Sequence, residues 1–380
     1  MRRNLVVLGS TGSIGRQTLD VARSFKDRIA VFGLATHRNV DILAAQAAEF
    51  CPAAVALGPD VDAGAALGSV RVLQGDSAMT ELVTHPEVDL VVVGTAGSAG
   101  LLPTLAALRA GKLVALANKE TLVMAGSVIR QVLNDGSGGE LVPIDSEHSA
   151  IWQCLQGEPG QSIEQLTLTA SGGALRALSA RELEEVTPEQ ALQHPTWSMG
   201  TKITIDSANL MNKGLEAIEA RWLFDLAFDR IQVLLHPQSI VHSLVTFSDS
   251  STKAQMGLPD MRLPIQYALS HPTRWSNDLP RLDLASVGQL SFAPVDLDRY
   301  PALGLAVRAG QAGGTYPAVL SAADEVAVQA FLEKRIKFTE IPSTLQAVLD
   351  AHSPCRTPAL DDILEADRWA RSIACRLVST

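Results

Sequence analysis

Short apolar runs alternate with helical patterns over residues 1–145 of this chain. The apolar runs fall at residues 5–8, 29–34, 88–93 and 113–117, and they show no alternation of apolar and polar positions. Strands of this kind are typical of a parallel sheet that is covered by helices on both faces. Crossovers between such strands are right-handed. We therefore predict a Rossmann-like parallel sheet at the N-terminus.

The pattern changes after residue 145. Strands are predicted at residues 166–170, 202–206, 231–235, 243–247 and 253–257, and a helix at about 209–228. A proline-bearing stretch follows, and the pattern is then helical to the end. The predicted fold class is α/β plus α+β, because 380 residues exceed one compact core. The predicted parts are a nucleotide-binding domain over 1–145, a central catalytic α+β domain over 146–270, a linker over 271–301 and a C-terminal helical domain over 302–380.

Composition excludes several classes of partner. The net charge is −10, and the chain has no clustered basic block of the kind that binds nucleic acid. The uncharged window 90–108 is interrupted by glycines and a proline, so a buried strand, loop and helix explain it better than a membrane span. The 4 cysteines form no Cys-x-x-Cys pair, which favours reduced thiols in the cytoplasm.

A glycine-rich turn follows the first predicted strand. Residues 9–15 read GSTGSIG, with glycines spaced G-x-x-G-x-x-G. Glycines allow the backbone to approach a pyrophosphate, whose charge then meets the N-terminus of the following helix. The alternative is a plain strand-to-helix turn. The position between a first strand and a helix favours dinucleotide binding.

The loop after the second strand indicates which dinucleotide is bound. An NAD site usually has Asp or Glu here, whereas this chain has Arg38, next to His37 and Asn39. A cation at this point suits a ribose 2′-phosphate and so favours NADP. The alternative is that Arg38 is only a solvated loop residue.

Three carboxylates suggest a metal site. Asp145 and Glu147 follow the apolar run 141–144, and in an extended chain they point to the same side. Such a pair suits Mg²⁺ or Mn²⁺, although alone it is more often polar surface. Glu216 is the third candidate. With Asn209, Asn212 and Lys213 it falls at helical spacing on one face, where the first turn favours an anion. The alternative is a solvated amphipathic helix.

Other polar clusters lie near these candidates. Asn118, Lys119 and Glu120 follow a predicted strand, at the sheet edge where ligands gather. The segment from Ser171 to Gly173 can offer a hydroxyl and amides to an anion. Residues 194–200 (HPTWSMG) form either a lid over a substrate or a rigid turn with Trp197 in the core. His236 and His242 are interpreted as structural.

Together these segments resemble the 1-deoxy-D-xylulose-5-phosphate reductoisomerase family. The resemblance is carried, in order, by residues 9–15 (GSTGSIG), 117–123 (ANKETLV), 143–153 (PIDSEHSAIWQ), 194–200 (HPTWSMG), 211–216 (MNKGLE), 236–243 (HPQSIVHS) and 257–262 (GLPDMR). It implies the three domains given above, which the linker joins, and a homodimer.

The resemblance also implies roles for single residues. Catalytic roles fall to Lys119, Glu147 and His194; substrate binding to Ser146, Ser171, Trp197, Ser207, Asn212 and Lys213; and metal binding to Asp145, Glu147 and Glu216. Cofactor binding falls to Thr11, Gly12, Ser13, Ile14, Arg38, Asn39, Asn118 and Glu120, and Met199 joins Trp197 in a flexible flap.

The reaction that the resemblance implies has two steps. Mg²⁺ or Mn²⁺ polarises the substrate's ketone and hydroxyl while the carbon skeleton rearranges, and NADPH then reduces the resulting aldehyde to 2-C-methyl-D-erythritol 4-phosphate. Two alternative functions are considered. One is an NADP-dependent dehydrogenase that acts on a phosphorylated substrate without rearrangement, and the other is a non-catalytic NADP-sensing regulator. Neither has a use for three converging carboxylates.

The chain departs from the family pattern at a few positions. Asn209 stands where the family usually has Ser or Thr, and the cofactor loop is filled unusually by Thr36, His37 and Arg38. Ser321 and Asp324 both stand where asparagines are usual, and Ser250 replaces a glycine. These departures concern details of the cofactor and substrate pockets.

Overall fold

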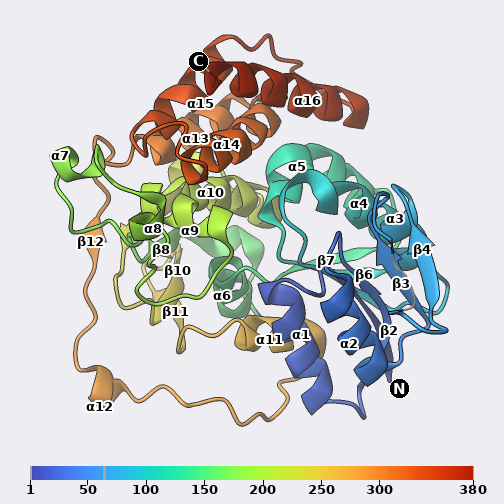
Figure 1. Ribbon diagram of the computed structural model, residues 1–380. Helices are drawn as coiled ribbons and strands as arrows, with labels where there is room; N and C mark the ends of the chain where they lie inside the picture. Colours follow the sequence, from blue (N-terminus) through green and yellow to red (C-terminus); the bar gives the residue numbers. More distant parts are fainter. Residues whose placement is uncertain (1, 63–65, 380) are drawn as a thin grey trace. The chain divides into compact units, whose positions relative to one another are not determined.

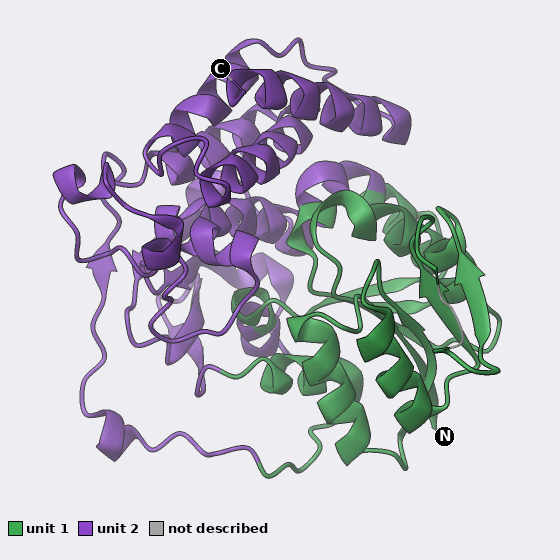
Figure 2. Ribbon diagram, viewed as in Figure 1, with its two compact units in different colours: residues 1–121, 129–149, 260–278 green, residues 122–128, 150–259, 279–380 purple. Residues whose placement is uncertain are grey.

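The computed structural model describes residues 2–62 and 66–379. By their contacts these residues form two compact units (Figure 2). Unit 1 comprises Met1–Thr121, Ile129–Ser149 and Asp260–Asp278, and unit 2 comprises Leu122–Val128, Ala150–Pro259 and Leu279–Thr380. The four-part division of the sequence given above stays a prediction. Residues 260–278 illustrate the difference, since they pack with the N-terminal sheet.

Unit 1 is built on a seven-stranded parallel sheet (Figure 1). Its strands, in spatial order, are β4 (Arg71–Gln74), β3 (Ala54–Leu57), β2 (Ile29–Ala35), β1 (Arg3–Leu8), β5 (Leu90–Val93), β6 (Leu113–Leu116) and β7 (Glu140–Pro143). The strand order reverses between β1 and β5, which are direct neighbours in parallel register. Crevices beside such reversals are the usual ligand sites of α/β sheets.

The helices of unit 1 are α1 (Ser13–Ser24), α2 (Val40–Phe50), α3 (Ala78–Val83), α4 (Leu101–Arg109), parts of α5 (Lys119–Asn134) and α6 (Ser146–Cys154), and α11 (Arg262–Ser270). Helices α1, α2, α3, α4 and α11 pack against the sheet. Strands β1 and β5 are buried along their central residues, as expected for a sheet packed on both faces. The predicted Rossmann-like sheet is thus confirmed.

Unit 2 contains a mixed sheet of β11 (Thr252–Met256), β10 (Val241–Phe247), β8 (Ile163–Ala170), β9 (Ile231–Leu235) and β12 (Ala293–Pro294), in that order. Strands β8 and β9 are parallel, and the other pairs are antiparallel. Helix α10 (Met211–Phe224) packs against β8 and β9. Short helices α7 (Ala180–Leu183), α8 (Pro188–Ala191) and α12 (Leu284–Val287) lie in the connecting segments.

The C-terminal part of unit 2 is helical, as predicted. It consists of α13 (Pro301–Ala312), α14 (Tyr316–Leu332), α15 (Glu340–Asp350) and α16 (Leu360–Leu377). Helix α14 contacts α13, α15 and α16, and most of its residues are buried. In the described part of the chain, no helix is long and apolar enough to cross a membrane.

One predicted element is wrong. Residues 202–206 were expected to be a strand, but they belong to helix α9 (Thr201–Asn209). The alternation of Ile203 and Ile205 fits a strand, yet Ile205 and Ala208 are spaced for a helix and enter the core beside Met211. Packing of this helical face overrides the local strand preference of the Thr and Ile residues.

The predicted helix over about 209–228 is interrupted at its start. Leu210 adopts the left-handed conformation, with φ of 61°, and it separates α9 from α10. The side chain of Asn209 closes the break, since its Oδ1 accepts a 2.8 Å hydrogen bond from the backbone N–H of Met211. Asn209 therefore lies outside α10, and it does not share the helical face of Asn212, Lys213 and Glu216 as expected.

Candidate functional site

The glycine-rich turn lies where the strand order of the unit 1 sheet reverses. Gly9 follows β1 with φ of 74°, and a side chain there would come within 2.5 Å of the carbonyl oxygen of Gly94, after β5. A side chain at Gly15 would lie 2.3 Å from the carbonyl oxygen of Gly9. The two glycines thus let two loops and a helix start meet closely, as a pyrophosphate-binding turn requires.

The predicted cofactor residues around this turn differ in exposure. Thr11 is buried, and its hydroxyl lies 2.7 Å from the hydroxyl of Thr36 in the next loop. Arg38 and Asn39 are exposed in that loop, as is Gly12, whereas Ser13 and Ile14 are half-buried. The first and second βα loops are therefore joined by the Thr11–Thr36 contact, and Arg38 is accessible to an anion.

The side chain of Asn118 stabilises the start of α5. Its Nδ2 donates to the carbonyl oxygens of Thr95 and Gly97, both at 2.8 Å, and its Oδ1 accepts from the backbone N–H of Thr121. The side chain therefore caps the helix and ties it to the loop after β5. Glu120, in the first turn, is half-buried.

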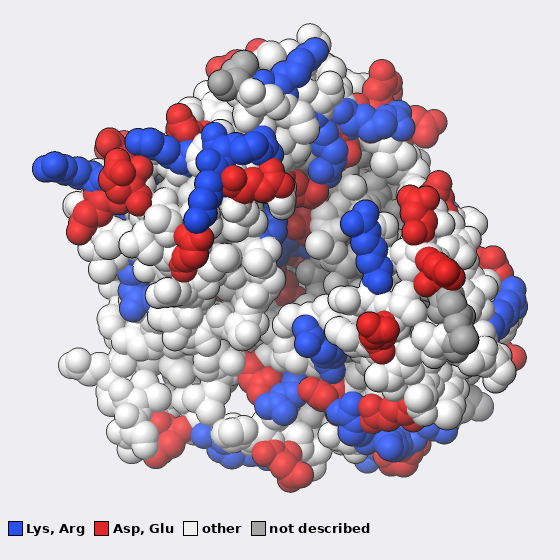
Figure 3. Space-filling view, in the orientation of Figure 1, with Lys and Arg blue, Asp and Glu red and all other residues white. Residues whose placement is uncertain are grey.

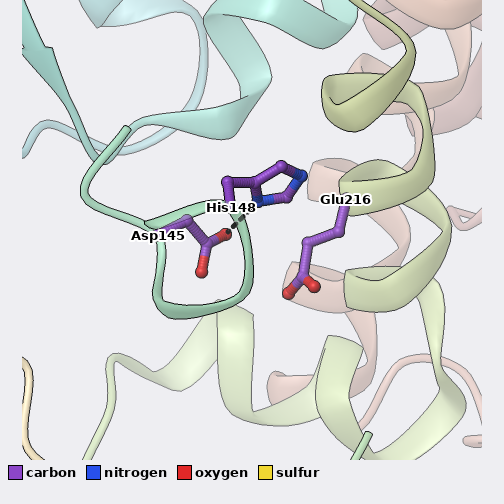
Figure 4. Close-up of side chains that lie close together, drawn as sticks. All are labelled: Asp145, His148 and Glu216. Atoms are coloured by element: carbon purple, nitrogen blue, oxygen red, sulfur yellow. Dashed lines mark ion pairs between the residues drawn. The ribbon is translucent and has the colours of Figure 1, made fainter. Parts of the chain in front are cut away.

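The residue after Asn118, Lys119, forms an ion pair with Asp145. Lys119 Nζ lies 2.5 Å from Asp145 Oδ2, and the two side chains are 6% and 12% exposed. His148 Nδ1 lies 3.9 Å from the same oxygen, and this side chain is fully buried (Figure 4). One carboxylate oxygen thus faces a lysine and an imidazole.

His148 was missed by the sequence analysis. The extended conformation expected for residues 145–147 is wrong, because α6 begins at Ser146. On a helix the residue three positions after Asp145 returns to its side, so His148 meets the carboxylate. Glu147, half-buried, accepts a 2.8 Å hydrogen bond at Oε2 from the hydroxyl of Ser146. The Asp-x-x-His spacing in the sequence is the signal that could have predicted this contact.

In unit 2, Glu216 is held by the two neighbours that share its helix face. Lys213 Nζ lies 2.6 Å from its Oε2, and Asn212 Nδ2 donates to its Oε1 at 2.6 Å. The side chains of Lys213 and Glu216 are 5% and 1% exposed. Figure 4 shows Glu216 projecting from α10. A buried carboxylate with a cation and an amide at its oxygens is a preformed polar site.

The segments that contain Ser171 and His194 are also brought together. His194 Nε2 lies 2.9 Å from Ser171 Oγ, and His194 Nδ1 faces the backbone N–H groups of Thr196 and Trp197. The half-buried ring of Trp197 lies 6.2 Å from the ring of His242. Burial and then the charge of Arg176 lower the pKa of His194.

Ser207 and the loop of Ser171 are packed backbone to backbone. Gly173 has φ of 68°, and a side chain there would come within 2.5 Å of Ala208 Cα and 2.7 Å of the carbonyl oxygen of Ser207. The loop after β8 therefore rests on α9 beside Ser207. Met199 is half-buried in the segment that leads into α9.

The contacts of His236 agree with the structural role interpreted from the sequence, and that role of His242 stays a prediction. His236 Nε2 accepts from the backbone N–H groups of Ile240 and Val241, and its Nδ1 lies 2.9 Å from the carbonyl oxygen of Ser291. Burial, above all, lowers the pKa of His242 to about 4.

The charges on the surface are mixed. On the face shown in Figure 3, Lys and Arg side chains lie among Asp and Glu side chains. This agrees with the sequence, in which like charges do not form blocks.

Comparison with known proteins covers the whole chain. Three family models match: 1-deoxy-D-xylulose 5-phosphate reductoisomerase over residues 5–126, its C-terminal domain over 141–224, and a DXP reductoisomerase C-terminal domain over 256–373. Curated reductoisomerases of this name from Thermomicrobium roseum and Pelotomaculum thermopropionicum are 51% and 50% identical. They cover 100% and 99% of this chain, and 98% of each relative is covered.

Solved structures agree with the sequence relatives. The Zymomonas mobilis reductoisomerase in complex with NADPH is 41% identical, with a TM-score of 0.92 and 100% of both chains covered. A DOX-P reductoisomerase in complex with NADPH, fosmidomycin and magnesium is 40% identical, with a TM-score of 0.93, covering 99% of this chain and 98% of that one.

Proposed function

The chain belongs to the 1-deoxy-D-xylulose 5-phosphate reductoisomerase family, and we propose which of its residues bind the metal, the substrate and NADPH. It is an NADPH-dependent enzyme that converts 1-deoxy-D-xylulose 5-phosphate to 2-C-methyl-D-erythritol 4-phosphate, a step of non-mevalonate isoprenoid synthesis. The residue roles below are our assignments.

We assign the metal to Asp145, Glu147 and Glu216. Oxygen ligands of this kind suit Mg²⁺ or Mn²⁺, and Asp145, His148 and Glu216 are side chains that could hold a metal ion. The carboxylates of Asp145 and Glu216 each already face an ammonium group, that of Lys119 or Lys213. Buried carboxylates that need positive partners fit a divalent cation. When bound, such a cation supplies Lewis-acid stabilisation of the oxyanion that develops on the substrate.

The substrate phosphate is assigned to Ser171, Ser207, Asn212 and Lys213. Two observations support this. The Ser171 loop packs on α9 at Ser207, and Asn212 and Lys213 lie in the first turn of α10, where a helix start attracts anions. Binding the phosphate, which does not react, supplies energy that holds the reacting carbons in place.

The sugar backbone is assigned to Lys119, Ser146 and His194. Lys119 carries a proton that can stabilise a developing oxyanion, and its pairing with Asp145 fixes its ammonium group. The hydroxyl of Ser146 is oriented by Glu147. Trp197 and Met199 belong to a flap that excludes water when it closes over the substrate.

NADPH is assigned to unit 1. The turn formed by Thr11, Gly12, Ser13 and Ile14 receives the pyrophosphate at the start of α1, and Arg38 with Asn39 receives the 2′-phosphate. Asn118 and Glu120, at the start of α5, are also assigned to the cofactor. Asn118 serves there mainly by shaping the loop after β5.

We also propose that the enzyme is a homodimer in the cytoplasm. The β11 edge of the unit 2 sheet is open to pairing, and the connection near β12 exposes the apolar side chains of Leu284, Phe292 and Leu297. The free thiols of Cys51, Cys154, Cys355 and Cys375 suit a reducing compartment. Sedimentation velocity at micromolar concentration tests the dimer, and a single monomer peak would contradict it.

The observation that carries the residue assignment is the pair of buried polar clusters, Lys119 with Asp145 and Lys213 with Glu216. The test is NADPH oxidation with 1-deoxy-D-xylulose 5-phosphate, first with Mg²⁺ or Mn²⁺ and then with excess EDTA. We expect oxidation that depends on metal and is much slower with NADH. Oxidation that persists unchanged in EDTA would refute the metal assignment.

A further inference from the structure

Lys202 joins two buried carboxylates within unit 2. Its Nζ lies 2.7 Å from Asp206 Oδ2 and 2.7 Å from Asp324 Oδ2. The side chain of Lys202 is 24% exposed, whereas those of Asp206 and Asp324 are 2% and 0% exposed. A buried carboxylate needs a positive partner, and here one ammonium group serves two of them.

The bridge connects the short helix α9 to the long, largely buried helix α14. Lys202 and Asp206 lie one turn apart on α9, which begins directly after Gly200, the last residue of the assigned flap. Asp324 lies in the middle of α14, whose neighbouring residues Ala323 and Ala327 are buried in the bundle core. The N-terminal turn of α9 is therefore fixed to a largely buried helix of unit 2.

The position of α9 matters because this helix contains Ser207. Ser207 follows Asp206 directly, and the backbone at Ser207 and Ala208 is in close contact with Gly173. Gly173 also donates its N–H to Ser171 Oγ at 3.2 Å. A displacement of α9 would therefore move Ser207 and disturb Ser171 as well.

We propose that Lys202 is a positioning residue: through Asp206 and Asp324 it holds α9 against the Ser171–Gly173 loop and so sets the affinity for the substrate's phosphate group. This rests on the assignment of Ser171 and Ser207 to the phosphate. Lys202 itself does not touch the substrate. Removing its charge leaves two carboxylates that repel each other across the joint between α9 and α14.

The test compares three variants of the full-length enzyme. Lys202→Met removes the charge at similar length, and Asp324→Asn keeps an oxygen acceptor for Lys202 but removes one carboxylate. Lys334→Met is the matched control, since Lys334 forms an exposed ion pair with Glu189. For each we would measure KM and kcat with 1-deoxy-D-xylulose 5-phosphate, the Kd of NADPH, the Kd of inorganic phosphate and the Tm.

We expect Lys202→Met to raise KM and the Kd of phosphate by about 10- to 100-fold, as is usual when a supporting contact behind a binding group is lost. Asp324→Asn should give a smaller rise in both. The Kd of NADPH should stay as in wild type in both variants, and Lys334→Met should behave as wild type throughout.

Two outcomes would overturn the proposal. One is a lower Tm in Lys202→Met with unchanged KM and phosphate affinity, which would reduce the bridge to a purely structural role. The other applies if Lys202→Met does not fold: Asp324→Asn with wild-type KM and phosphate affinity then rejects the proposal. The proposed function would fail separately, if the wild-type enzyme bound phosphate but did not turn over the substrate. In that case the phosphate titrations of the variants would still decide the role of Lys202.

Discussion

The Nε2 atom of His194 lies 2.9 Å from the hydroxyl oxygen of Ser171, and the opposite ring nitrogen decides which of the two groups donates. His194 Nδ1 accepts from the backbone N–H groups of Thr196 and Trp197, so in the neutral ring the proton sits on Nε2. His194 therefore donates to Ser171. Because the N–H of Gly173 also donates to that hydroxyl, the hydroxyl's own hydrogen can be donated to a phosphate oxygen.

Two amide replacements of His194 separate these contacts. The Nε2 of Gln in His194→Gln can still donate to Ser171, whereas the Oδ1 of Asn in His194→Asn can still accept from the flap amides. If orientation of Ser171 dominates, His194→Gln should raise KM less than His194→Asn, with about a tenfold difference between them, the size of one hydrogen bond. Steady-state kinetics with 1-deoxy-D-xylulose 5-phosphate measures this. Equal KM values for the two variants would show that Ser171 is not oriented by His194.

Stability should fall in acid because of His242. Burial lowers the pKa of His242 from 6.5 to about 4. Between these values the unfolded chain binds a proton that the folded chain does not, so the free energy of unfolding decreases as pH falls through this window. The loss should reach about 3 kcal/mol below pH 4.

Urea unfolding at a series of pH values measures this loss. His242→Gln should flatten the profile between pH 6.5 and 4, whereas replacement of the exposed His37 by Gln should leave it as in wild type. A His242→Gln profile as steep as that of wild type would assign the acid sensitivity to other groups.

Removing the charge of Glu216 should weaken metal binding and remove most of the activity. Glu216→Gln keeps the shape of the side chain but loses a ligand charge and the ion pair with Lys213. We expect kcat to fall by at least about 100-fold, the usual size of a lost oxyanion-stabilising contact. The Mn²⁺ concentration for half-maximal activity should rise as well. Glu189→Gln, at an exposed ion pair, is the control. Normal activity in Glu216→Gln would remove Glu216 from the metal site.

Arg38 should determine the preference for NADPH. Arg38→Gln removes a charged contact to the 2′-phosphate, so the KM for NADPH should rise by about 10- to 100-fold. The KM for NADH, which has no 2′-phosphate, should change little. Arg109→Gln, at another exposed position, serves as the control. An equal effect of Arg38→Gln on both cofactors would mean that Arg38 supports the loop and does not recognise the phosphate.

The sequence predicted most of the parallel sheet because its central strands are apolar on both faces. It missed β3, β4 and β7, in which alanine, proline or polar residues interrupt the apolar run. It also predicted a strand at residues 202–206, where the pattern of Ile203 and Ile205 is compatible with either structure. Packing against the bundle core decides between them, and the local sequence does not contain that information.

The candidate site was predictable where chemistry and spacing agree along the chain, as for Asn212, Lys213 and Glu216 on one helix face. It was not predictable where a contact depends on the tertiary fold. The pairing of Lys119 with Asp145 joins the ends of two neighbouring strands, and the bridge from Lys202 to Asp324 spans two helices. The helical start of α6, which brings His148 to Asp145, was obscured by the apolar run before it.

The left-handed conformation of Leu210 lowers the stability of the fold. A non-glycine residue in this conformation is strained by about 1 kcal/mol, and Leu210 is 2% exposed, so glycine would relieve the strain but lose its packing. Without the interruption, Asn212 and Lys213 would lie in the interior of one long helix instead of the first turn of α10. A lysine in a first turn opposes the helix dipole. Fold stability alone does not favour this arrangement, but it places the two residues that we assign to the substrate phosphate at the start of a helix.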